Sequence, residues 1–120
     1  MKRFVFVKSP ERVLVYDIDE QKKLIFYYYM EYSHSFGWRP LDVIIFTPRF
    51  LKRKEFEEAI NIAKSKGASR GFIVVQIIED WEKFAKRIEK DYEEYKRKYG
   101  DKNIQKLRDY EKLKEVIGEK

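Results

Sequence analysis

The segment from residue 42 to residue 78, DVIIFTPRFLKRKEFEEAINIAKSKGASRGFIVVQII, decides the fold. Residues 42–46 are rich in β-branched side chains and predict a strand, and Thr47 followed by Pro48 is typical of the start of a helix. Residues 71–78 form an almost unbroken apolar run, which predicts a second strand, covered on both faces in the middle of the sheet. Two strands joined through a helix pair in parallel, so the segment predicts a βαβ unit with a right-handed crossover.

Three more strands are predicted before this unit. Residues 3–7, 12–18 and 24–32 are short runs of β-branched and aromatic side chains separated by polar or turn-forming residues. They predict an antiparallel meander. Residues 33–41 contain a glycine, a proline and serines, and they predict a loop before the fourth strand.

Two helices are predicted after the βαβ unit. Residues 81–99 carry apolar side chains at steps of three and four, and the same spacing continues from about Asp101. We expect these helices, within residues 79–120, to form a helical hairpin. The predicted fold is therefore a single α+β domain over residues 1–120, with the element order β-β-β-β-α-β-α-α. Its N-terminal antiparallel β-meander and the βαβ unit form one mixed sheet.

Composition limits the class of protein. The chain has 120 residues, of which 43% are hydrophobic and 40% charged, and it contains no cysteine. The absence of cysteine excludes disulfides, thiolate zinc sites and thiol catalysis. Abundant charge is typical of hyperthermophile proteins, so we expect a hyperthermophilic archaeon or an archaeal virus as the source. No apolar run is long enough for a signal peptide or a membrane span, which predicts a cytoplasmic protein without a membrane partner.

The net charge of +6 is concentrated in the first two thirds of the chain. Residues 79–120 contain 13 basic and 12 acidic side chains, whereas residues 1–78 contain 14 basic and 9 acidic ones. Four cations, Arg49, Lys52, Arg53 and Lys54, lie in the predicted first turn of the helix. The helix dipole repels cations there, which favours a bound anion at this position, and backbone N–H groups would complete a phosphate site.

These observations predict a protein that binds nucleic acid, with DNA favoured over RNA and no cofactor required. The predicted contacts lie at strand ends, in loops or in the first helical turn: Lys8, Arg12, Trp38, Arg39, Arg49, Lys52, Arg53, Lys54 and Arg70. In addition, alternate aromatic residues of the run 26–29 would stack on unpaired bases if one face of the meander is uncovered.

A metal-dependent nuclease is the first alternative. Asp17, Asp19 and Asp42 lie at predicted strand ends, where carboxylates can gather around Mg²⁺, and the only histidine, His34, could act as a general base beside Asp17 and Asp42. The restriction-endonuclease pattern requires Glu-x-Lys on the strand after the aspartate. Here that strand offers only Gln76-x-Ile78.

A second strand assignment leads to the same chemistry. If Asp19 begins a helix over residues 19–34, the strand at residues 13–18 opens an α-β-α-β order that resembles the ferredoxin-like small nuclease of CRISPR spacer acquisition. The resemblance implies that Asp17 binds the metal. The chain departs from that family in its extra first strand, and the run LIFYYYMEY favours a strand over a helix.

The third hypothesis is a non-enzymatic interaction protein that forms homo-oligomers. The apolar stripe of residues 81–99 is longer than a small sheet requires, and it includes Tyr92, Tyr95 and Tyr99. A homodimer through the C-terminal helices would cover this stripe.

Overall fold

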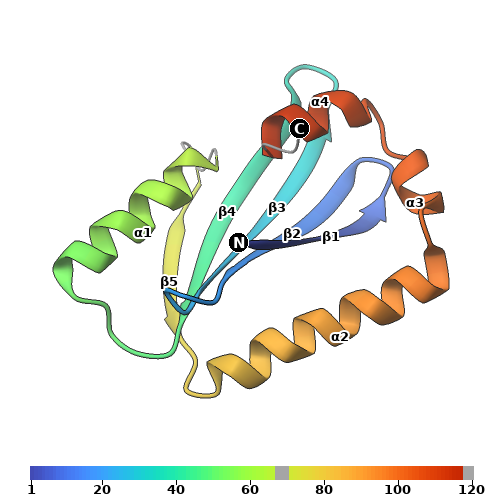
Figure 1. Cartoon of the computed structure of the whole chain (residues 1–120). Coiled ribbons are helices and arrows are strands. Elements are labelled where there is room, and N and C mark those ends of the chain that lie inside the picture. Colours follow the sequence, from blue (N-terminus) through green and yellow to red (C-terminus); the bar gives the residue numbers. More distant parts are fainter. Residues whose placement is uncertain (67–70, 118–120) are drawn as a thin grey trace.

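The computed structural model describes residues 1–66 and 71–117 (Figure 1). The strands are β1 (Lys2–Ser9), β2 (Arg12–Asp19), β3 (Leu24–Ser33), β4 (Gly37–Thr47) and β5 (Ile73–Ile77). The helices are α1 (Arg53–Ser65), α2 (Trp81–Tyr99), the short α3 (Lys102–Gln105) and α4 (Tyr110–Ile117). This order confirms the predicted α+β fold, with the last helix divided in two. Within the described ranges, no helix is both long and apolar enough to cross a bilayer.

The strands form one mixed sheet in the order β1-β2-β3-β4-β5. The first three pairings are antiparallel, and β4 pairs with β5 in parallel, which confirms the meander and the βαβ unit. The central position predicted for residues 71–78 is wrong, because β5 lies at the edge of the sheet. Residues 71–78 are apolar enough for a strand that is covered on both faces, but no other strand of the described chain pairs with the outer edge of β5.

Two boundaries also differ from the predictions. β4 continues through Thr47, and α1 begins at Arg53, because Lys52 keeps an extended backbone and donates its N–H to the Glu55 carboxylate, 3.1 Å away. Residues 33–41 do not form a loop. β3 and β4 pair as far as Ser33 and Gly37, so only residues 34–36 connect them. A helix over residues 19–34 is likewise wrong, because most of this segment is β3.

Helices cover the two faces of the sheet separately. α1 packs Ala59 and Ala63 on one face, and α4 adds Leu113 to the same cluster. We call this the α1 face. On the opposite face, α2 packs Trp81 and Ile88 against the sheet, and we call it the α2 face. The buried residues of α2 thus belong to the α2-face cluster, whereas Tyr95 near its end packs against the cluster that contains Leu113 of α4. α2 and α4 do not run side by side (Figure 1), so the predicted helical hairpin is not formed. The apolar stripe of α2 is used within the chain.

Candidate functional site

The register of the strands arranges the α2 face in rows, because directly paired residues of neighbouring strands point to the same side. The first row is Lys2, Ile18, Ile25, Phe46 and Gln76. The second row, two residues further along each strand, is Phe4, Tyr16, Tyr27, Ile44 and Val74. α2 packs on the apolar middle of the first row, which is buried.

The α2 face becomes more exposed beyond the first row. All of the second row is at least partly exposed, and Val74 at its end is 46% exposed. Further along, Leu14 and Tyr29 are also only partly buried. α2 crosses the face toward β1, where its Tyr95 hydroxyl accepts the N–H of Val7 at 3.0 Å. Tyr16, Tyr27 and Ile44 pack against the cluster that α2 forms on this face but remain partly exposed. We define the open sheet surface as Leu14, Tyr16, Tyr27, Tyr29, Ile44 and Val74.

Tyrosines dominate this open sheet surface. The rings of Tyr16 and Tyr27 lie 5.0 Å apart between centroids and are tilted by 52°. Burial raises the pKa of both hydroxyls, and the neighbouring Tyr29 raises that of Tyr27 further. The hydroxyls therefore remain neutral hydrogen-bond donors at physiological pH. A surface of partly exposed aromatic rings with neutral hydroxyls suits a flat, uncharged ring system.

Cations border the open sheet surface on the side of the β3–β4 turn. Arg12 pairs across the sheet with Glu31, and Glu31 pairs with Arg39, so the next row is basic, acidic, basic. Arg12 contacts Glu31 at 3.3 Å, whereas the guanidinium of Arg39 lies over the exposed ring of Phe36, 4.7 Å from its centroid. Lys8 is exposed near the end of β1. Three predicted contact residues, Lys8, Arg12 and Arg39, thus lie at one end of the sheet.

The two other residues predicted near this end have structural partners. Trp38 is not in a loop but in β4, where it is only 5% exposed and donates its Nε1–H to the Arg108 carbonyl at 2.6 Å. Its ring is therefore not available to stack on a base. His34 is exposed in the β3–β4 turn, where its Nε2 lies 3.1 Å from a guanidinium nitrogen of Arg108. Its ring also packs edge-on against Tyr32.

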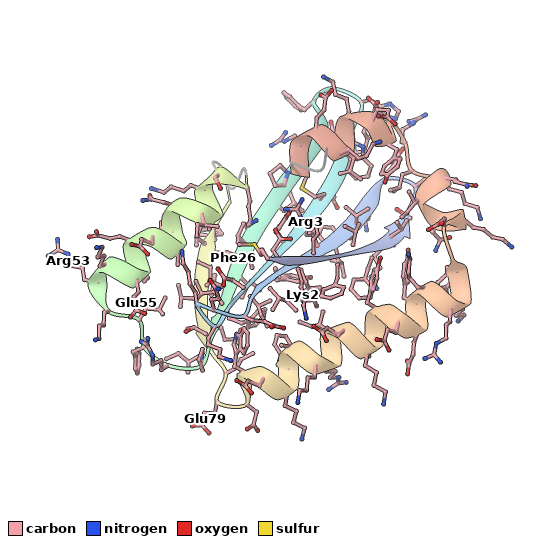
Figure 2. The ribbon with its side chains drawn as sticks, in the orientation of Figure 1. Lys2, Arg3, Phe26, Arg53, Glu55 and Glu79 are labelled. Atoms are coloured by element: carbon pink, nitrogen blue, oxygen red, sulfur yellow. The ribbon has the colours of Figure 1, made fainter. Side chains whose placement is uncertain are left out.

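The cations near the start of α1 lie at the opposite end of the sheet, after β4. Figure 2 shows Arg53 pointing outward at the start of α1. Arg49 forms two hydrogen bonds with the Glu55 carboxylate, at 2.9 and 3.2 Å, and Arg53 contacts Glu57 at 3.2 Å. The hydrogen bond from Arg49 lowers the pKa of Glu55. Arg49 and Arg53, which the sequence predicts to bind an external anion, thus form ion pairs with glutamates of the same chain. Lys52 and Lys54 are exposed.

A cleft of about 290 Å³ adjoins this second group. The β2–β3 turn contributes Lys22 and Lys23, the β4–α1 connection contributes Arg49, and α1 contributes Glu55 and Glu58. Acidic and basic side chains therefore both line the cleft, so it offers an anion no clear net attraction. The predicted contacts do not form one continuous site, and Arg70 lies outside the described residues.

The carboxylates of the nuclease hypothesis do not converge. Asp17 is fully buried on the α1 face, where Arg3 donates two hydrogen bonds to it, at 2.7 and 3.0 Å, and Lys66 donates another. Burial alone would raise the pKa of Asp17, but the hydrogen bonds and charges of Arg3 and Lys66 outweigh it, so the pKa is lowered. Asp42 accepts the N–H of Phe72 at 2.8 Å, and Asp19 accepts that of Lys22 at 3.1 Å.

Each predicted metal ligand thus has its own partner in the fold. Asp17 lies opposite Phe26 in the sheet, and Phe26 lies opposite Ile45 of β4, so the three side chains point to the same face. Asp42 is three residues before Ile45 and therefore lies on the opposite face. Within residues 1–66 and 71–117, no three His, Asp or Glu side chains are grouped closely enough to hold a metal ion together.

Comparison with protein-family models, with curated proteins and with solved structures finds no match. Function is therefore inferred from the chemistry of these surfaces alone.

Proposed function

We propose that the protein binds single-stranded nucleic acid on the open sheet surface. The observation that supports the proposal is the combination of two partly exposed tyrosines, Tyr27 and Tyr29, with a neighbouring row that carries Arg12 and Arg39. Aromatic rings on a sheet stack on unpaired bases for about 1–3 kcal/mol per base, whatever the base. Arginines beside such rings bind the phosphates that follow.

The spacing along β3 suits this arrangement. Tyr29 and the basic row are two residues apart, which is about 7 Å along a strand. A nucleotide stacked on Tyr29 would therefore place its phosphate near the guanidinium of Arg12 or Arg39. Because Glu31 lies between the two arginines and forms its ion pair with Arg12, Arg39 is the arginine with less competition from a carboxylate.

The open sheet surface is preferred over the start of α1 for an electrostatic reason. Arg49 and Arg53 are each paired with a glutamate of α1, so a phosphate bound there must compete with these carboxylates. Arg39 has an aromatic ring as its neighbour instead, and a guanidinium stacked on a ring keeps its N–H groups free for a phosphate.

The test is a binding titration of a fluorescently labelled DNA single strand, with RNA and duplex DNA of the same sequence for comparison. Binding through phosphates predicts that log K falls with log salt by about 0.7 per neutralised phosphate. Tyr29→Ala should weaken binding about 5- to 150-fold without changing this slope, since it removes stacking alone. Arg39→Ala should reduce the slope by about 0.7.

Arg53→Ala is the matched control, because it removes an exposed arginine at the opposite end of the sheet. We expect it to leave both the affinity and the slope unchanged. Failure to bind any of the three probes at low salt would refute the proposal. If Arg53→Ala weakened binding while Tyr29→Ala did not, the site would belong at the start of α1 and the open sheet surface would have no part in it.

A further inference from the structure

The two edges of the sheet differ in how they are protected. An unprotected edge strand pairs readily with another strand, and proteins prevent this with charges or with covering side chains. β1 has both: Lys2 and Lys8 are exposed, and the Tyr95 hydroxyl accepts the N–H of Val7 at 3.0 Å. In contrast, residues 71–78, which include β5, contain neither a charged residue nor a proline.

The backbone groups that β5 presents outward can be assigned. The Phe72 carbonyl accepts the N–H of Val43 at 3.0 Å, and the Ile78 N–H donates to the Thr47 carbonyl at 2.8 Å, so these even-numbered residues face β4. In a strand, alternate residues direct their N–H and C=O to opposite sides. Ile73, Val75 and Ile77 therefore direct theirs to the free edge, where no residue in the described parts of the chain bonds to them.

The side chains around this edge are apolar and exposed. Phe72 is 77% exposed, Val74 46% and Ile77 38%. They lie on both faces of the strand, which is the pattern of a strand with neighbours on either side. The sequence of β5 thus matches a central strand, although in one copy of the chain it lies at an edge.

We infer that β5 pairs with β5 of a second copy of this chain, antiparallel across a two-fold axis. With Val75 on the axis, Ile73 lies opposite Ile77 of the other copy, and the outward groups of all three residues face each other. Each residue donates one bond and accepts one, so about six backbone hydrogen bonds form. The two five-stranded sheets then become one continuous sheet.

A second copy is the occupant that the chemistry of the edge favours. Because residues 71–78 carry no charge, two copies can meet without placing like charges opposite each other. The same neutrality offers no electrostatic recognition to a charged partner. About Val75 the strand pairs Ile73 with Ile77 and Val74 with the uncharged Gln76 of the other copy, which meets the self-complementarity that a two-fold interface requires.

This inference goes beyond the proposed function and does not depend on it. The first test is the mass of the full chain in solution, by sedimentation or light scattering, at micromolar concentration. We expect twice the 14.7 kDa of one chain. Val74→Lys places a charge on the edge strand, and Ile77→Pro removes an outward N–H, so each should halve the mass. Val116→Lys, at a similarly exposed valine of α4, should leave the dimer intact.

Amide exchange followed by NMR gives an independent second test, which remains informative if Ile77→Pro does not fold. In the dimer, the N–H groups of Ile73, Val75 and Ile77 should exchange slowly, as we also expect of Val74 and Gln76, which face β4. In Val74→Lys, the three odd-numbered amides should become fast and residue 76 should stay slow. A monomeric wild type with fast exchange at the odd-numbered positions would overturn the inference. So would a dimer that survives Val74→Lys or that dissociates with Val116→Lys.

Discussion

The ammonium of Lys66, at the C-terminal end of α1, donates a hydrogen bond to the buried carboxylate of Asp17 on β2. Arg3 of β1 binds the same carboxylate, and the Tyr28 hydroxyl of β3 donates to it at 3.1 Å. One buried charge thus links a helix and three strands. Lys66 also lies over the rings of Phe26 and Tyr28, so its charge is shielded from water by aromatic side chains.

Asp17→Asn should destabilise the protein strongly. The substitution removes the negative charge but leaves Lys66, whose side chain is almost buried, and Arg3 without their counter-ion. Removing one partner of a buried ion pair costs about 3–5 kcal/mol. The free energy of unfolding, from urea titration, measures the loss. Asp101→Asn, at an exposed position, is the control and should change it by less than about 0.5 kcal/mol. An equally small effect at Asp17 would show that the buried pair contributes little.

The same carboxylate predicts how stability depends on pH. The folded pKa of Asp17 lies below its ordinary value of about 3.9, so the folded state favours the charged form. Its contribution to stability is therefore complete above about pH 4 and is lost as the pH falls through the folded pKa. We expect the difference in unfolding free energy between wild type and Asp17→Asn to be constant from pH 5 to 7 and to narrow below pH 4. Other carboxylates titrate in both proteins and cancel in this difference. If the difference in unfolding free energy between wild type and Asp17→Asn increased below pH 4, the pKa of Asp17 would be raised in the folded state and not lowered.

The sequence predicts the fold correctly where a local pattern is compatible with only one type of secondary structure. The apolar runs at residues 12–18 and 24–32 gave strands, and the βαβ order gave the parallel pairing with β5. Thr47 and Pro48 predict too early a start for α1, because the helix begins at Arg53 and does not use these two start signals. The signal that it does use is Glu55, three residues after Lys52, which accepts the Lys52 N–H as the glutamate of a capping box does.

Side-chain contacts and strand pairing set the limit for predicting the site. The sequence predicts an external phosphate for Arg49 and Arg53, whereas the structure pairs them with Glu55 and Glu57. Sequence spacing allows these two ion pairs but does not require them. The local sequence predicts a loop at Trp38, because the strand at residues 37–41 depends on pairing with β3 and not on local preference. The pairing of Asp17 with Lys66 joins residues 49 positions apart, and no local pattern indicates it.

Gly71→Ala should destabilise the junction between β4 and β5. A Cβ atom at residue 71 would lie 2.7 Å from the Asp42 Oδ1 atom and 3.2 Å from the Asp42 backbone nitrogen, and the backbone cannot move without disturbing β4. Overpacking of this kind costs about 1–3 kcal/mol. Thermal unfolding measures it as a lower Tm. Asp42→Asn is the control, because it keeps an oxygen that can accept the Phe72 N–H, and its Tm should stay near that of the wild type. If Asp42→Asn lowered the Tm as much as Gly71→Ala, the charge of Asp42 and not the space at Gly71 would be the cause.

Tyr95→Phe should weaken the protection of the β1 edge. The substitution keeps the ring, which packs against Phe6 at 5.3 Å between centroids, but removes the oxygen that accepts the Val7 N–H. A partly buried donor without its acceptor costs about 1 kcal/mol, so the free energy of unfolding should fall by that amount. The Val7 amide should also exchange with solvent faster than in the wild type. Tyr99→Phe, on the more exposed last turn of α2, is the matched control and should change neither quantity. If Val7 exchange stayed slow in Tyr95→Phe, another group would have to cover this edge.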